Sequence, residues 1–165
     1  MTDWRLNMRE VFVDDVIETN KEMLNPGEEF RILDVNRLES AIGNQWAPYP
    51  TDEQAIASVF RSLIQNHPFE NANKRTAVVI MKLMADDINR EIVLSDDELG
   101  DLVYKLADAG GSKISVTSIA NKLFGLDLEE ALEDNMIEEP IEEARVQTAV
   151  KSNGVFSVMN NEWMS

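Results

Sequence analysis

The residues best suited to chemistry lie together in one segment, His67-Pro68-Phe69-Glu70-Asn71-Ala72-Asn73-Lys74-Arg75. His67 is the only histidine among the 165 residues, and three residues able to hold phosphate follow it within eight positions. An imidazole with a pKa of about 6.5 can accept a hydroxyl proton near neutral pH. Asparagine, lysine and arginine side chains donate hydrogen bonds to phosphate oxygens. The segment therefore predicts a phosphate-handling active site with His67 as general base.

Two helices are expected to position this segment. The capping box Thr51-Asp52-Glu53-Gln54 opens an amphipathic helix, which must end before Pro68 because the residue preceding a proline is driven out of the α region. Residues 77–81 and 83–84, which follow the segment, are apolar almost all the way round, and this predicts a buried central helix over residues 73–89. Its N-terminus would offer an anion free backbone N–H groups and the positive end of the helix dipole.

The rest of the pattern predicts an all-α fold of about six helices. Ser95 and Ser115 have the residue types and positions of helix N-caps, and Gly125 is expected just after the last helix. Segment 44–50 holds two prolines and two large aromatic residues, so it is expected to be a loop or an edge strand. The four remaining helices are expected at residues 9–24, 34–43, 95 to about 110, and 115–125.

Composition and charge narrow the class of protein. The chain has no cysteine, which excludes disulfides and thiolate metal sites, and its net charge of −16 argues against binding a nucleic-acid backbone. No apolar stretch has the length of a membrane span, and the start lacks the apolar core of a signal peptide. We therefore expect a cytoplasmic protein. Half of the excess charge falls in residues 126–165, which predicts a 1–125 domain and an acidic C-terminal extension.

The extension has its own predicted elements. Residues 127–139 are compatible with an acidic helix before Pro140, and apolar residues 146–150 and 155–158 flank Asn153-Gly154, a two-residue hairpin signal. Its charge is usual for a solvated surface, and the alternative is that the extension folds across a positively charged active site.

Each candidate site residue also has a structural interpretation. His67 can be held by hydrogen bonds alone, and Asn73 can cap the helix that it opens, a role compatible with anion binding. Lys74 and Arg75 can be solvated surface charges, although cations at a helix N-terminus oppose the dipole unless a bound anion compensates. Phe69 is expected to anchor the loop in the core under either interpretation.

The segment resembles the signature of the Fic/Doc family, in which His-x-Phe-x-acidic-small-Asn precedes Gly or Lys and then Arg. Lys74 and the following Arg75-Thr76-Ala77 are most similar to the Doc (death-on-curing) toxins. The resemblance extends over about residues 9–125, through Arg37-Leu38-Glu39-Ser40-Ala41 and the two last helices.

This resemblance implies an all-α fold in which the motif loop opens the central helix. It also implies transfer of part of ATP to a protein hydroxyl, with His67 as base and with Ala72, Asn73, Lys74 and Arg75 around the phosphates. A lysine where adenylyltransferases keep glycine favours transfer of the terminal phosphoryl over transfer of AMP. The translation elongation factor Tu is the target known for the family.

One position departs from the family pattern. Asn71 stands where the family has Asp or Glu as a Mg²⁺ ligand, and an amide oxygen binds a hard cation without supplying charge. Glu70 is adjacent and is expected to be a solvated charge, since a shift of one residue points it elsewhere. Weakened Mg²⁺ binding is therefore expected.

Two further expectations concern partners. Trp46 and Tyr49 lie where the family has a flap that positions the target chain by strand addition, and the alternative is that they cover the core. No Ser or Thr of the chain has a Glu four residues later, as the inhibitory helix of Fic proteins has. Inhibition is therefore expected from a separate antitoxin.

These observations leave two hypotheses of different classes. The first is a Doc-like toxin that phosphorylates a Ser or Thr of a host protein, with adenylylation as the alternative transfer. The second is a weakened Fic/Doc scaffold whose acidic extension imitates nucleic acid and occupies a basic surface of a partner.

Overall fold

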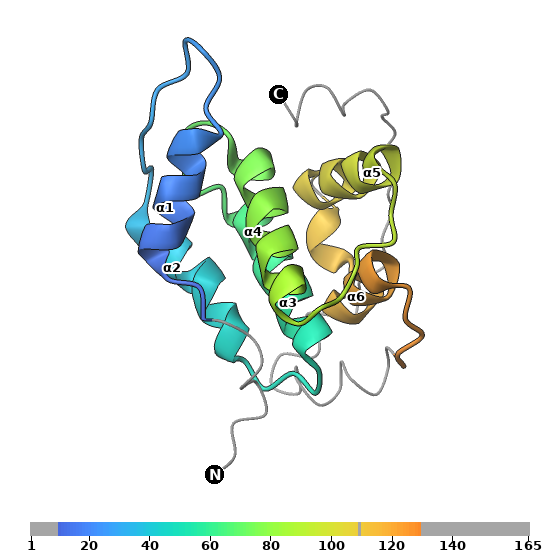
Figure 1. Ribbon diagram of the computed structural model, residues 1–165. Helices are drawn as coiled ribbons and strands as arrows, with labels where there is room; N and C mark the ends of the chain where they lie inside the picture. The colour runs from blue at the N-terminus through green and yellow to red at the C-terminus, as the bar shows by residue number, and fades with distance from the viewer. Residues whose placement is uncertain (1–9, 109, 130–165) are drawn as a thin grey trace.

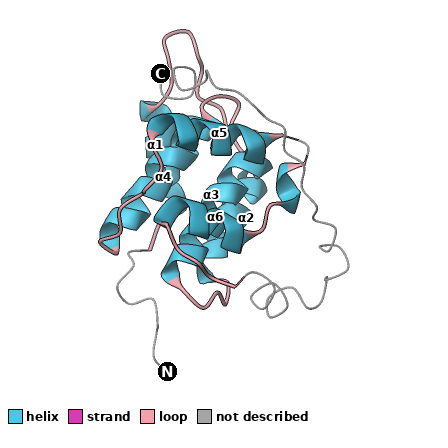
Figure 2. Cartoon of the chain, turned by 90° about the vertical axis from the view of Figure 1, so that its right-hand side faces the viewer, coloured by secondary structure: helices cyan, strands magenta, loops and turns pink. Residues whose placement is uncertain are grey.

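The computed structural model describes residues 10–108 and 110–129. Within these ranges Figure 2 shows helices joined by loops and no strand, and the one β-like feature is an isolated bridge between Ile32 and Phe69. The prediction of an all-α fold of about six helices is confirmed. The elements are α1 (Val13–Glu22), α2 (Val35–Gly43), the 3-10 turn η1 (Asn44–Trp46), α3 (Asp52–Asn66), α4 (Asn73–Asp87), α5 (Asp96–Ala107), the 3-10 turn η2 (Gly111–Lys113) and α6 (Val116–Phe124) (Figure 1).

Helix α3 lies at the centre of the bundle. It packs against α2, α4, α5 and α6, so that α1 and α2 lie on one side of the α3–α4 pair and α5 and α6 on the other (Figure 1). The prediction that the helix at 73–89 is buried on every side is wrong, because Lys82 and Leu83 of α4 are exposed. In contrast, α3 buries even polar Gln54, whose Nε2 donates to Thr117 Oγ1 on α6. Hydropathy alone does not detect a polar side chain that tertiary hydrogen bonds allow into the core.

Most helix ends follow local signals in the sequence. Thr51 and Ser95 each accept the backbone N–H of the residue three positions on, and the side chain of that residue reaches back, so both predicted capping boxes are confirmed. Ser115 caps α6, which ends at Gly125 in the left-handed region with φ of 67°. These three-residue patterns need no tertiary partner, which is why the sequence alone locates them.

The side chain of Gln45 is linked to two differences from prediction, at the start of α1 and in segment 44–50. Val11 N donates to Gln45 Oε1 at 3.0 Å and Gln45 Nε2 donates to Val11 O at 2.8 Å. This pairing holds the chain before α1 out of the helix that was predicted over 9–24. Gln45 itself lies in η1, so 44–50 begins with a 3-10 turn, and 47–50 continue as a loop. Of the two alternatives predicted for 44–50, the loop is confirmed for 47–50 and the edge strand is wrong.

The C-terminal predictions fall mainly outside the described residues. Of the expected acidic helix at 127–139, only 127–129 are described, and they are not helical. The expected hairpin of 146–150 and 155–158 lies wholly outside the described residues. Within the described ranges, no helix combines the length and apolarity that crossing a membrane requires.

Candidate active site

The motif loop joins α3 to α4 through two residues in the left-handed region. His67 has φ of 52° at the end of α3, and Ala72 has φ of 64° just before α4. Left-handed conformation costs an L-residue about 1–2 kcal/mol. Such strain persists only where surrounding structure imposes it, and it is concentrated at functional sites. The loop is therefore held in shape by its neighbours.

Asn73 fixes the backbone of this loop through two hydrogen bonds to Phe69. Its Oδ1 accepts the backbone N–H of Phe69 at 2.9 Å and its Nδ2 donates to the Phe69 carbonyl at 2.8 Å. The N-cap of α4 is Ala72, without a side-chain hydrogen bond, so the predicted capping role of Asn73 is wrong. The Asn73 amide is not available for capping because it binds the backbone inside the loop.

Phe69 anchors the loop in the core, as predicted. Its side chain is 1% exposed and its ring lies 6.1 Å from the ring of Phe30. The backbone around it pairs with the segment before α2, since Leu33 N donates to Pro68 O at 2.8 Å and Glu70 N donates to Arg31 O at 2.9 Å. The motif loop is thus clamped between α4 and residues 30–33.

His67 lies at the surface beside this anchor. Its Nδ1 is 3.3 Å from Asn73 Nδ2, and its backbone carbonyl accepts a hydrogen bond from Arg37 Nη1 at 3.3 Å. Desolvation by the surrounding protein, followed by the positive charges of Lys74 and Arg37, lowers the pKa of His67 from its ordinary value. His67 is therefore mostly neutral at pH 7, which is the form that can accept a proton.

Lys74 extends from the first turn of α4 toward α5. Its Nζ lies 5.1 Å from the centroid of the Tyr104 ring, a cation–π contact. The backbone N–H groups at the start of α4 have no intrahelical carbonyl to bind. Lys74 and these N–H groups together form a positive end to the loop, close to His67.

Arg75 is placed differently from either prediction. Its side chain is mostly buried, and it donates through Nη1 and Nη2 to the two carboxylate oxygens of Glu28, at 3.0 Å each. Nη1 also donates to the Met23 carbonyl. Arg75 is therefore not a solvated charge, and its fork already binds a carboxylate in place of a phosphate. It ties the turn after α1 to α4.

The site also depends on Asn20, which the sequence analysis missed. This fully buried residue of α1 donates through Nδ2 to the Asn71 carbonyl at 2.9 Å and to Thr76 Oγ1 at 3.0 Å. It lies four positions after the buried Val16, and a polar residue on the apolar face of a helix was the available signal.

Asn71 and Glu70 lie on the outer side of the loop. Asn71 Nδ2 donates to the Glu29 carbonyl at 3.1 Å, and Glu70 pairs with Arg31 at 3.3 Å where both side chains are exposed. Within the described ranges no group of three or more His, Asp or Glu side chains is arranged to hold a metal ion.

Trp46 and Tyr49 lie between α2 and α3, in the segment where a target-positioning flap was expected. Tyr49 is buried and its hydroxyl donates to Ser58 Oγ at 3.2 Å, in agreement with the core-covering alternative, while Trp46 is 49% exposed at the end of η1. The segment that pairs with the motif backbone is instead 31–33.

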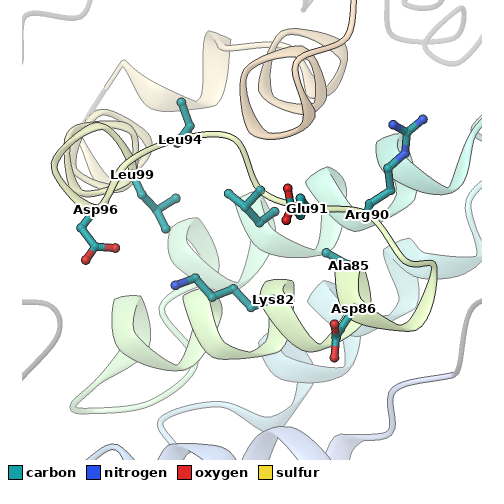
Figure 3. A pocket seen from close by; sticks show the side chains of 9 residues that line it. Lys82, Ala85, Asp86, Arg90, Glu91, Leu94, Asp96 and Leu99 are labelled. Atoms are coloured by element: carbon teal, nitrogen blue, oxygen red, sulfur yellow. The ribbon is translucent and has the colours of Figure 1, made fainter.

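A pocket of about 300 Å³ lies at the other end of α4 (Figure 3). Lys82, Ala85 and Asp86 of α4 line it, with Leu94 and Leu99 opposite. None of the motif residues lines it, so this pocket is separate from the candidate active site.

Comparison with known proteins agrees with the geometry. A model of the Fic/DOC family matches residues 11–85, from two residues before α1 to the last turn of α4 and including the whole motif. No curated protein matches the chain, and no solved structure matches it. Members of this family generally transfer nucleotide-derived groups to proteins. The match, together with the helical fold and the motif loop between α3 and α4, assigns residues 11–85 to the Fic/DOC family.

Proposed function

We propose that the chain is a Doc-like transferase that moves the terminal phosphoryl group of ATP to a Ser or Thr hydroxyl of a target protein. The observation that carries the proposal is the meeting of His67, with its lowered pKa, and Lys74 at the N-terminus of α4. A phosphate at this place meets a fixed cation, free N–H groups and the positive end of the dipole. A proton acceptor lies beside it.

The step assigns a role to each residue. The target hydroxyl oxygen forms a bond to the γ-phosphorus, the bond from that phosphorus to the bridging oxygen breaks, and ADP leaves. His67 takes the hydroxyl proton, a role that is typically worth about 10²–10⁴-fold in rate. Lys74 and the backbone at Ala72 and Asn73 stabilise the phosphate charge.

Arg75 is given a different role from the one that the resemblance implied. Its pairing with Glu28 supports a structural function, which is to fix the loop that carries residues 28–33 against the motif. The phosphates are then held mainly by Lys74 and the backbone.

Lys74 also supports phosphoryl transfer over AMP transfer. Its side chain follows the loop directly, and Tyr104 holds its charge near the helix start. A bulky cation at this place, where adenylyltransferases have glycine, changes how the nucleotide can lie. We therefore propose the γ-phosphate as the group transferred.

We propose that Mg²⁺ takes part in the reaction but is bound only weakly by the protein. The hydrogen bond from Asn71 Nδ2 to Glu29 leaves Asn71 Oδ1 as the amide's oxygen for a cation. Mg²⁺ is commonly held by one or two carboxylates together with substrate phosphates, so a single neutral oxygen fits it only weakly. When bound, Mg²⁺ would neutralise phosphate charge. We propose that the nucleotide supplies most of its ligands.

Incubation of the full chain with ATP labelled at the α or the γ phosphate tests the proposal. Purified elongation factor Tu and a bacterial lysate serve as sources of target. Label from the γ position on a protein, lost in His67→Ala and kept in the distant Lys122→Ala, supports phosphoryl transfer. Label from the α position would show adenylylation instead. Absence of both labels from every protein would refute transferase activity.

A further inference from the structure

The orientation of the Asn73 amide is fixed by the loop backbone. Oδ1 accepts from Phe69 N at 2.9 Å and Nδ2 donates to Phe69 O at 2.8 Å. The reversed amide would place two donors together at one contact and two acceptors together at the other, so only one assignment satisfies both bonds. Nδ2 carries two protons, and the second is left to face Nδ1 of His67 at 3.3 Å.

From this arrangement we infer that Asn73 sets the tautomer of His67, with the lone pair on Nδ1 and the proton on Nε2. A neutral imidazole has one donor and one acceptor nitrogen, and the partner of one nitrogen determines the state of the other. Because the partner of Nδ1 is a donor, Nδ1 must be the acceptor. Asn73 is thus a positioning residue for the candidate base.

Two positively charged side chains near His67 disfavour its doubly protonated form. Lys74 approaches from α4 and Arg37 from α2, and both oppose the imidazolium form. That form would also place an Nδ1–H against the Asn73 N–H. These charges disfavour the doubly protonated ring but do not choose between the two neutral tautomers, so the choice is left to Asn73.

The tautomer has a consequence that rests on the proposed function. In the ligand-free chain Nε2 is a hydrogen-bond donor and cannot accept a hydroxyl proton. The ring becomes a base at Nε2 when that proton leaves to water and Nδ1 gains a proton from water. Because the Asn73 amide is held by the loop backbone, this exchange requires the His67 ring to move away from Asn73 Nδ2–H. That N–H then needs another acceptor, and a phosphate oxygen of the bound nucleotide has the necessary chemistry. Nucleotide binding would then switch on the base.

The single histidine makes the inference directly measurable. Long-range ¹H–¹⁵N NMR of the ¹⁵N-labelled full chain reports which nitrogen of His67 is protonated, with no overlap from other histidines. Above the pKa of His67 we expect the Nε2–H tautomer. A wild-type spectrum showing the Nδ1–H tautomer overturns the inference.

Because free imidazole side chains also favour Nε2–H, variants supply the decisive comparison. Asn73→Asp places a carboxylate against Nδ1, so we expect the neutral tautomer to become Nδ1–H and the pKa of His67 to rise. Asn73→Ala, the second variant, should give a mixture of tautomers. Lys74→Gln is the matched control, since it removes a charge and raises the pKa while leaving the tautomer unchanged. A folded Asn73→Asp chain that keeps the wild-type tautomer overturns the inference, and so does a folded Asn73→Ala chain with no larger fraction of Nδ1–H than the wild type.

Adding ATP to the labelled wild-type chain tests the switch. A change of His67 toward Nδ1–H on saturation supports it, and an unchanged tautomer with bound ATP overturns it. The tautomer of the free chain does not depend on catalysis. A chain without transferase activity but with the Asn73-dependent tautomer would therefore refute only the proposed function.

Discussion

Replacing Glu28 with glutamine removes the charge that holds Arg75 and leaves the size of the side chain nearly unchanged. Two hydrogen bonds of 3.0 Å join the pair, and the side chains of Arg75 and Glu28 are 10% and 26% exposed. Removing one partner of a buried pair costs about 3–5 kcal/mol. Partial exposure of Glu28 and the one bond that glutamine can still accept reduce this, so we expect a loss of about 2–3 kcal/mol.

Thermal and urea unfolding measure the loss, which corresponds to a fall in Tm of about 5–10 °C. Arg75 first, and then the Asn25 backbone N–H, lower the pKa of Glu28 from its ordinary 4.5. Ionised Glu28 thus stabilises the folded chain above pH 4.5. The difference from Glu28→Gln should be complete at pH 7 and should shrink as the pH falls below 4.5.

Glu29→Gln is the matched control, because it makes the same charge change at the exposed neighbour. If Glu28→Gln unfolds within about 0.5 kcal/mol of Glu29→Gln at pH 7, an effect typical of a surface substitution, the clamp assigned to Arg75 is refuted.

The remaining predictions concern the anchor, a helix cap and the metal. Phe69→Ala should cost about 3–5 kcal/mol in urea unfolding, because the ring is fully buried, and a loss below 1 kcal/mol would contradict its role as anchor. Thr51→Ala removes the acceptor for Gln54 N and should cost about 1 kcal/mol, while retention of full stability, with Thr51→Ser as control, would contradict the cap. Asn71→Asp adds a charged oxygen and should tighten Mg²⁺ binding in the presence of ATP about tenfold by calorimetry. Equal Mg²⁺ affinity of Asn71→Asp and Asn71→Ala would place the metal elsewhere.

The sequence indicated which residues lie at the candidate site better than it indicated which residues they contact. His67, Asn73 and Lys74 are near one another in the chain, so their spacing alone indicated one site, and the structure keeps them together. The partners of Arg75 and Asn71 were not predictable. Glu28 and Glu29 lie 47 and 42 residues away from them, and no local pattern identifies a pair across such distances.

The sequence by itself determined the features whose causes lie within a few residues: helical periodicity, the caps at Thr51, Ser95 and Ser115, and the end of α3 before Pro68. Tertiary structure alone decided the others. It placed α3 at the centre of the bundle, and it brought the Asn73 amide within hydrogen-bond distance of the Phe69 backbone. The physical reason is that a polar side chain leaves water for whichever partner packing brings within hydrogen-bond distance, and packing depends on the whole chain.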